Sequence, residues 1–230
     1  MIEAIVFDGD DTLWQTEWLY DHARRQAREV VEAAGFDGED WEQRERLIDV
    51  ANVGRFGHSA DRFPTSCAEA YEEMCDAAGQ GVDPTIREAV WDAARTVFTS
   101  QAPLMDGARE TLETLRSRGL RLALLTKGDP VVQRRRIEQS GLAPLFDLVE
   151  IVAEKTPAAI AEVLDRLGVP LSAGLTVGNS VRSDVLPSLL AGVSPVWIDA
   201  HVWEYERDHD EVPPGEVTRK EELSGVLEMV

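Results

Sequence analysis

Residues 5–14 have the sequence IVFDGDDTLW, an apolar run that leads directly into closely spaced carboxylates. The acidic residues and the hydroxyl residue that follows them are Asp8, Asp10, Asp11 and Thr12. A short apolar run with β-branched residues predicts a buried strand over residues 2–7 that ends at these side chains. Like charges this close together at the end of a buried strand cost stability. Their presence therefore indicates that a ligand or a reaction uses them.

The same apolar pattern recurs further along the chain. It predicts strands at residues 120–126, 146–152, 175–178 and 194–199. Between them lie helical patterns that cover 107–119, open at Asp129–Pro130, open at Thr156–Pro157, and run from Ser180 to Gly192. Asp or Thr followed by proline is typical of a helix start. Strands that alternate with helices of about 10–15 residues predict an α/β fold with a doubly wound, Rossmann-like parallel sheet.

Residues 16–100 have a different pattern, with apolar residues at helical spacing and no convincing strand. We therefore expect an all-helical cap domain at 16–100, inserted into an α/β core domain formed by 1–15 and 101–230. The acidic, turn-rich segment 201–217 is expected to cover the surface of the core.

The composition excludes some classes of partner. The chain has 230 residues, 43% hydrophobic and 29% charged, with a formal net charge of −20. Such a charge repels nucleic acid and anionic membranes, so we expect neither as a partner. The chain begins with a predicted strand and acidic turn instead of a signal sequence, and has no apolar run of about 18–20 residues that spans a bilayer. We expect a cytoplasmic protein, a monomer or a homodimer.

The remaining candidate residues have structural interpretations. Cys67 and Cys75 are predicted to lie unpaired on one apolar helix face. The four histidines show no zinc-binding spacing. Asp11 is predicted to be a turn carboxylate.

Polar side chains follow several of the predicted strands or open the helices after them. They are Asp8 and Asp10, Thr126 and Lys127, Lys155, and Asn179 and Asp184. In an open parallel sheet, ligands bind beyond the carboxyl ends of the strands. Clustered carboxylates bind Mg²⁺, while a lysine and helix amino-termini bind phosphate oxygens. A carboxylate can attack phosphorus, and a second one can protonate the leaving group. Together these groups suit phosphoryl transfer.

The motifs resemble those of the haloacid dehalogenase-like hydrolases. Four motifs of that family are matched in order, by FDGDDT (7–12), LLT (124–126), EKTP (154–157) and VGNSVRSDV (177–185). The resemblance covers essentially the whole chain and implies a Rossmann-like core with a helical cap inserted after the first motif. It also implies a Mg²⁺-dependent phosphatase that acts on small phosphorylated metabolites through an aspartyl-phosphate.

The resemblance also implies the role of each motif residue. Asp8 would be the nucleophile and a metal ligand, and Asp10 the general acid and base, binding Mg²⁺ through its backbone carbonyl. Thr126 and Lys155 would hold the phosphoryl oxygens, with Lys127 as a further substrate-binding residue. Asn179 and Asp184 would complete the metal site. Many family members have Asp where this chain has Asn179, and an amide brings one negative charge fewer to the metal.

Substrate selection is expected to come from the helical insert. Its stretch 50–65, ANVGRFGHSADRFPTS, is predicted to contain a loop between helices that closes over the substrate. We expect Arg55 and His58 to contact the leaving group.

Alternative functions use the same scaffold. A haloacid dehalogenase typically lacks the second motif aspartate, so Asp10 argues against that reaction. A phosphonate hydrolase needs a Schiff-base lysine in the cap, and residues 16–100 contain no lysine. A sugar-phosphate mutase remains open. A catalytically silent binding protein is expected to lose Asp8 or Asp10, and both are present.

Overall fold

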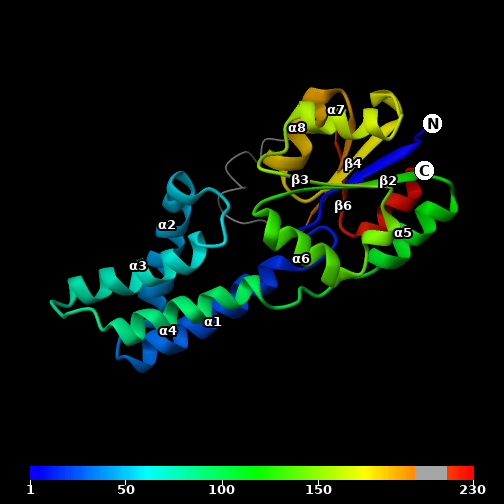
Figure 1. The fold of residues 1–230 in the computed structure, drawn as a ribbon. Helices are drawn as coiled ribbons and strands as arrows, with labels where there is room; N and C mark the ends of the chain where they lie inside the picture. The colour runs from blue at the N-terminus through cyan, green and yellow to red at the C-terminus, as the bar shows by residue number, and fades with distance from the viewer. Residues whose placement is uncertain (200–216) are drawn as a thin grey trace. The chain divides into compact units, whose positions relative to one another are not determined.

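The computed structural model describes residues 1–199 and 217–230 (Figure 1). By its backbone contacts the chain divides into two compact units. The core unit comprises Met1–Glu17 and Gln101–Val230, and the helical unit comprises Trp18–Ser100. The role of the helical unit as a cap stays a prediction. Nearly all of the segment expected to cover the surface, residues 200–216, lies outside the described residues.

The core unit is built on one six-stranded sheet in which every strand pair is parallel, in the order β3-β2-β1-β4-β5-β6. The strands are β1 Ala4–Phe7, β2 Arg121–Lys127, β3 Leu148–Val152, β4 Gly174–Gly178, β5 Ser194–Ile198 and β6 Thr218–Lys220. The predicted doubly wound parallel sheet is confirmed, and its five predicted strands lie within two residues of their expected bounds. The sixth strand was not predicted.

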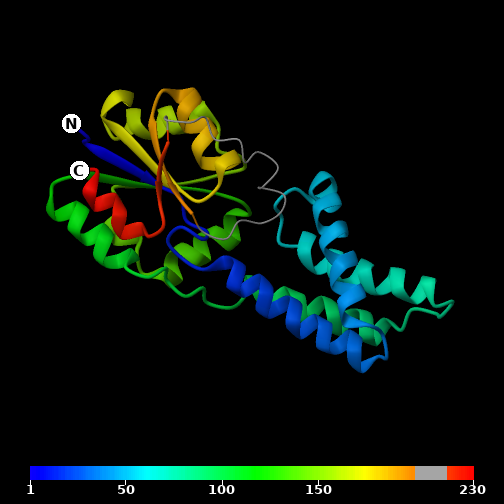
Figure 2. The same ribbon diagram turned by 180° about the vertical axis from the view of Figure 1, so that it is seen from behind.

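Helices cover both faces of this sheet. They are α5 Ala108–Ser117, α6 Pro130–Ser140, α7 Pro157–Arg166 and α8 Leu186–Ala191. Helices α7 and α8 lie on one face, and α5 and α6 on the other (Figure 1, Figure 2). On the first face, Ala4 and Val6 of β1 share a buried apolar cluster with Ile160 and Leu164 of α7. Because both faces are covered, all four residues of β1 are buried.

Two of the predicted helix starts are confirmed by their side-chain caps. The Asp129 carboxylate accepts hydrogen bonds from the backbone amides of Val131 and Val132, at 2.8 and 3.2 Å. The Thr156 hydroxyl accepts one from the amide of Ala159 at 3.1 Å. The second cap fixes the start of α7 directly after Lys155.

The helix predicted from Ser180 to Gly192 is not one continuous α-helix. A π-helical turn, Val181–Val185, comes first, and α8 begins at Leu186. Within the turn, the amide of Val185 reaches back five residues to the carbonyl of Ser180, at 3.1 Å. Pro187 lies in the first turn of α8, where its missing N–H leaves no bond for an earlier carbonyl. The wide turn places Asp184 at the end of the sheet.

The helical unit contains no strand within residues 18–100, all of which the structure describes. Its helices are α1 Thr16–Ala33, whose first turn belongs to the core unit, α2 Gly38–Phe56, α3 Arg62–Ala77 and α4 Pro84–Arg95. Cys67 and Cys75 are both buried and unpaired, as predicted. The prediction of a loop is wrong at Arg55, because α2 continues to Phe56. The helix ends at Gly57, whose φ of 58° does not fit an α-helix.

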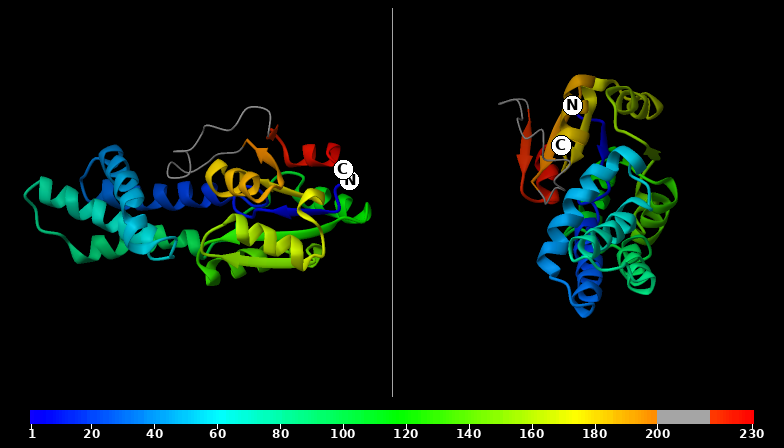
Figure 3. Two further views of the ribbon diagram at one scale, coloured as in Figure 1. Left: turned by 90° about the horizontal axis from the view of Figure 1, so that it is seen from above. Right: turned by 90° about the vertical axis from the view of Figure 1, so that its left-hand side faces the viewer.

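The chain leaves and re-enters the core unit through two segments that lie side by side. The amide of Gln15 donates to the carbonyl of Pro103 at 2.8 Å, and the amide of Met105 donates to the carbonyl of Leu13 at 2.9 Å. The two chain termini also lie near each other in the core unit (Figure 3). Across residues 1–199 and 217–230, every helix falls short of the length or the apolar character that crossing a membrane requires.

Candidate active site

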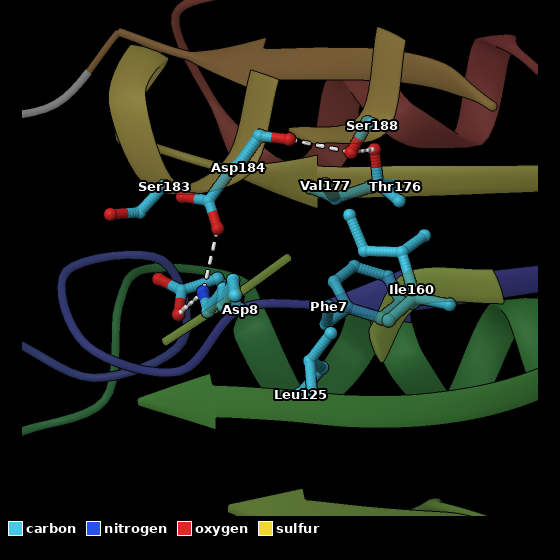
Figure 4. Close-up of a pocket in the computed structure, with 11 residues that line it drawn as sticks. Phe7, Asp8, Leu125, Ile160, Thr176, Val177, Ser183, Asp184 and Ser188 are labelled. Atoms are coloured by element: carbon cyan, nitrogen blue, oxygen red, sulfur yellow. Dashed lines mark hydrogen bonds and ion pairs between the residues drawn. The ribbon is translucent and has the colours of Figure 1, made fainter. Parts of the chain in front are cut away.

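Three buried charged side chains meet at the carboxyl ends of the central strands (Figure 4). Asp8 follows β1 directly, Lys155 precedes α7, and Asp184 lies in the π-helical turn after β4. The Lys155 ammonium donates to Oδ1 of Asp8 and, at 2.6 Å, to Oδ1 of Asp184. The structure thus brings together three residues that the sequence analysis selected from distant parts of the chain.

Burial and charge act against each other in this trio. Burial raises the pKa of the Asp8 carboxyl above its usual value, Lys155 opposes that rise, and Asp184 adds to it. Burial would lower the pKa of Lys155, but Asp184 and Asp8 together outweigh it and raise that pKa. Lys155 is therefore charged at neutral pH. With both carboxylates ionised, the trio keeps one negative charge in excess, which favours a cation beside it.

The position of Asp184 depends on close packing around its own turn. A Cβ atom at Gly178 would lie 2.2 Å from Cγ of Asp184, so only glycine fits there. The amide of Ser180 donates to Oδ2 of Asp184 at 3.0 Å. The Ser188 hydroxyl donates to the Asp184 carbonyl at 2.5 Å and accepts from the Thr176 hydroxyl at 2.7 Å. These buried hydroxyls satisfy a carbonyl that the π-helical turn leaves available.

The oxygen donors near Asp8 suit a magnesium ion. The Thr12 hydroxyl lies 3.0 Å from Oδ2 of Asp8 and 3.4 Å from Oδ1 of Asn179, and Trp197 donates to the Asn179 carbonyl at 2.9 Å. Asp8, Asp184 and Asn179 supply hard oxygen atoms, the ligands that Mg²⁺ prefers. Over the described part of the chain, no three His, Cys, Asp or Glu residues are grouped to hold a metal. The residues fit Mg²⁺ with two carboxylates.

A hydroxyl without a protein partner lies at the end of the neighbouring strand β2. Thr126 is buried, and its Oγ1 has no hydrogen-bond partner within the described residues. A Cβ atom at Gly9 would lie 3.3 Å from that hydroxyl and 2.5 Å from the ring of Trp14. Glycine thus lets the loop after β1 approach Thr126. A buried donor without a partner is costly and indicates a ligand oxygen. Lys127 follows Thr126 in β2, and its ammonium donates to the Ser183 hydroxyl at 2.6 Å.

The Asp10 carboxylate binds three donors. Its Oδ1 accepts from the Trp14 indole at 2.6 Å, and its Oδ2 accepts from Gln133 and Arg136 of α6, each at 2.8 Å. The sequence analysis missed Gln133 and Arg136. Their i, i+3 spacing places them on one side of a helix, but nothing in the sequence marks that side as facing Asp10.

Asp11 lies in the turn before helix α1, in agreement with its predicted role in a turn, and its side chain caps the start of that helix. Its carboxylate accepts from the amides of Thr16 and Glu17 at 2.8 and 3.0 Å. Its φ of 57° is unusual for a residue other than glycine, and aspartate is one of the few side chains that tolerate it. Burial, reinforced by Glu17, raises the pKa of Asp11 to about 7.

Arg55 and His58 belong to the helical unit, so their predicted contact with the leaving group stays a prediction. Within that unit, Arg55 pairs with Glu69 at 2.7 Å and donates to the Asn52 side chain at 2.9 Å. These contacts fix the direction of the guanidinium while 59% of the side chain remains exposed.

A small cavity of about 10 Å³ lies behind Asp8, among Lys155, Ser183 and Asp184 (Figure 4). Its apolar side is formed by residues of the sheet and α7, among them Phe7, Leu125 and Ile160. That volume holds about one water molecule. Apart from this small cavity, the charged groups rest against a packed apolar interior that keeps their electrostatic interactions strong.

Known proteins resemble this chain in sequence and in fold. A glyceraldehyde 3-phosphate phosphatase of Methanothermobacter thermautotrophicus is 27% identical, with all of both chains aligned. One of Methanopyrus kandleri is 29% identical, over 99% of this chain and 97% of that protein. The crystal structure of a haloacid dehalogenase-like family hydrolase from Xanthomonas campestris superposes with a TM-score of 0.75 at 28% identity, covering 97% of this chain and 92% of that one.

The family model for haloacid dehalogenase-like hydrolases matches residues 2–192, which include every motif residue described above. The chain therefore belongs to the haloacid dehalogenase-like hydrolase family.

Proposed function

We propose that the protein is a Mg²⁺-dependent phosphatase of small phosphorylated metabolites that forms an aspartyl-phosphate on Asp8. The observation that carries the proposal is the contact of Lys155 with both Asp8 and Asp184 at the carboxyl edge of the sheet. The phosphatase names of the two archaeal relatives support the reaction class.

In the proposed reaction, an oxygen of Asp8 attacks phosphorus, and the bond from phosphorus to the ester oxygen breaks. Asp10 gives a proton to the departing alcohol, then takes one from the water that hydrolyses the aspartyl-phosphate. Lys155 and the Thr126 hydroxyl hold the phosphoryl oxygens, and Lys127 adds positive charge nearby.

Asp8, Asn179, Asp184 and the carbonyl of Asp10 would hold the metal ion. When bound, Mg²⁺ supplies positive charge that offsets both the carboxylates and the phosphoryl oxygens.

The test compares Asp8→Asn with Asp129→Asn, measuring phosphate release with Mg²⁺. The substrates are p-nitrophenyl phosphate and a panel of phosphorylated metabolites that includes glyceraldehyde 3-phosphate. Asp129 caps α6, and asparagine caps a helix equally well, so this control is expected to keep full activity. Asp8→Asn is expected to lose all measurable turnover, and borohydride is expected to trap an acyl-phosphate only in proteins that keep Asp8.

Other outcomes point to the alternative functions. Release of halide from a 2-haloacid without phosphatase activity would support a dehalogenase. Isomerisation of a sugar phosphate without net phosphate release would support a mutase. Phosphate release by Asp8→Asn at more than a few per cent of the wild-type rate would refute the covalent mechanism.

A further inference from the structure

The Asp10 carboxylate is held by side chains from two separate parts of the core unit. Trp14 belongs to the loop after β1, whereas Gln133 and Arg136 belong to α6, more than a hundred residues later in the chain. The three bonds, of 2.6 to 2.8 Å, engage both carboxylate oxygens and so fix the plane of the group as well as its position.

The polar side chains of Gln133 and Arg136 are buried, and burying polar groups costs free energy unless they are paired. Gln133 is 2% exposed and Arg136 6% exposed, while Arg134 and Arg135 between them are exposed. A buried guanidinium costs several kcal/mol unless it is paired. Asp10 supplies a carboxylate that pairs with Arg136 at 2.8 Å, whereas an apolar residue at position 136 would avoid that cost.

Gln133 also links Asp10 to the strand that carries Thr126. Its side-chain amide donates to Oδ2 of Asp10 at 2.8 Å and to the carbonyl of Lys127 at 3.0 Å. One amide group thus sets the position of Asp10 relative to the end of β2, where the buried Thr126 hydroxyl lies. Gln133 thus fixes the position of Asp10, the proposed proton donor, relative to Thr126, which is proposed to hold the phosphoryl oxygens.

The loop that carries Asp10 holds the side chain of that residue through one bond, from the Trp14 indole to Oδ1. Its backbone is held by bonds from the amides of Thr12, Leu13 and Trp14 to the carbonyl of Gly9, at 3.3, 2.8 and 3.3 Å. These bonds position the backbone. Without the two α6 bonds to Oδ2, the Asp10 side chain, 29% exposed, would be held by the single Trp14 bond to Oδ1, which does not fix the plane of the carboxylate.

We propose that Gln133 and Arg136 are positioning residues that aim the Asp10 carboxylate at the leaving-group oxygen. The inference rests on the proposed function and adds that efficient proton transfer requires two side chains of α6. Because misplacing a catalytic group by about 1 Å costs on the order of 100-fold in rate, losing either contact should slow proton transfer far more than binding.

The test uses two esters that differ in their need for a proton. p-Nitrophenolate leaves readily without one, whereas the alcohol of glycerol 3-phosphate needs one. Rapid-quench measurement of the first turnover isolates the phosphorylation step, because hydrolysis of the aspartyl-phosphate is common to both esters. The variants are Arg136→Met, Gln133→Leu and Arg136→Lys, with Arg134→Met as the exposed control on the same helix.

We expect Arg136→Met and Gln133→Leu to slow the first turnover of glycerol 3-phosphate on the order of 10–100-fold and that of p-nitrophenyl phosphate by less than about 3-fold, with KM nearly unchanged. Arg136→Lys should recover part of the loss, and Arg134→Met should behave as wild type. Thermal unfolding of each variant checks that the protein is folded under assay conditions.

Equal losses on both esters, or faster turnover in any variant, would overturn the positioning role and leave Gln133 and Arg136 as anchors of the loop. The positioning role would also be overturned if the first-turnover rate fell only in proportion to the melting temperature of each variant and Arg136→Lys recovered none of the loss. A wild-type protein inactive on both esters and on the metabolite panel would instead refute the proposed function, and the inference with it.

Discussion

The ammonium of Lys155 lies 2.6 Å from Asp184 and at the same time binds Asp8, so one cation joins two buried carboxylates from different strands. The two carboxylates would otherwise repel each other in a site that excludes water. Lys155 therefore holds the two carboxylates of the candidate site together.

Replacing Lys155 should uncover this repulsion. Lys155→Met is expected to abolish phosphatase activity and to reduce the free energy of unfolding by about 3–5 kcal/mol at neutral pH, as for a broken buried ion pair. Mg²⁺ should restore more stability to this variant than to the wild type, because the metal would replace the missing charge. Urea unfolding with and without Mg²⁺ measures both effects. In Lys220→Met, which removes a surface pair with Glu228, a loss below about 1 kcal/mol is expected. Equal losses in the two variants would contradict this account.

The amide at Asn179 should limit metal affinity. Asn179→Asp adds one negative charge to the site, while the bond from Trp197 to the backbone carbonyl of residue 179 is kept. We expect Mg²⁺ to bind more tightly, by about 10-fold for each 1.4 kcal/mol gained. Calorimetric titration of the apoprotein with Mg²⁺ measures the affinity independently of activity. An unchanged or weaker affinity would exclude this residue from the metal site.

Two glycines allow a matched test of space around Asp184. Gly178→Ala should weaken Mg²⁺ binding and stability, because the added methyl group would overlap Asp184. Gly54→Ala adds the same group inside α2, where nothing lies within 4 Å, and should stabilise the protein by about 1 kcal/mol. Thermal unfolding of both variants, with a Mg²⁺ titration of the first, gives the comparison. A Gly178→Ala protein that bound Mg²⁺ normally would show that the turn can relax.

The helical unit should become less stable as pH rises. Glu45 is fully buried, 2.7 Å from Arg24, and burial raises its pKa to about 7, against the opposing effect of Arg24. The folded state therefore binds this proton more tightly than the unfolded state, whose pKa is about 4.5. The resulting stabilisation is complete below about pH 4.5 and is lost as pH rises to about 7 and above.

This single group contributes a slope of at most about 1.4 kcal/mol per pH unit. In Glu45→Gln the slope between about pH 4.5 and 7 should become shallower, as measured by chemical denaturation at several pH values. Glu73→Gln, which removes a carboxylate at a more exposed position of the same unit, serves as the matched control. An unaltered slope in Glu45→Gln would mean that Arg24 keeps the carboxylate charged.

The substrate preference should depend on Arg55. Arg55→Ala is expected to reduce kcat/KM about 10–100-fold for some metabolites, while p-nitrophenyl phosphate hydrolysis hardly changes. Glu69→Gln is a second test variant, because it removes the ion pair that orients the Arg55 guanidinium. We expect it to change the substrate preference less than Arg55→Ala does. Steady-state kinetics over the metabolite panel measures the effect. A uniform loss on every substrate, or no loss on any, would remove Arg55 from substrate selection.

The core of the fold could be predicted because its central strands β1, β2 and β4 are buried between the helices on the two faces of the sheet. Continuous apolar runs such as residues 120–126 therefore stand out from the helical patterns beside them. Strand β6, with the sequence TRK, has no such run and is recognised only through its pairing with β5. The π-helical turn at Val181–Val185 was missed for another reason, since residue periodicity does not report the register of backbone hydrogen bonds.

The residues of the candidate site could also be predicted only in part. Asp8, Lys155 and Asp184 follow strand ends or precede a helix, and parallel topology brings such positions together. Gln133 and Arg136 lie within a helix that contains three consecutive arginines, and only the fold shows which of them is buried. Arg55 was placed in a loop because glycines flank it in sequence, but Gly54 is tolerated within α2 and only Gly57 ends the helix.

The paired segments at Leu13–Gln15 and Pro103–Met105 have a consequence for how such a gene can change. Since the core already holds these two segments together by backbone hydrogen bonds, residues between them can be exchanged for another helical module without breaking the sheet or the order of its strands. Recombination at these two points would exchange the helical unit and leave the core unit unchanged. Selection can then act on the helical unit and on the core unit as separate inherited units.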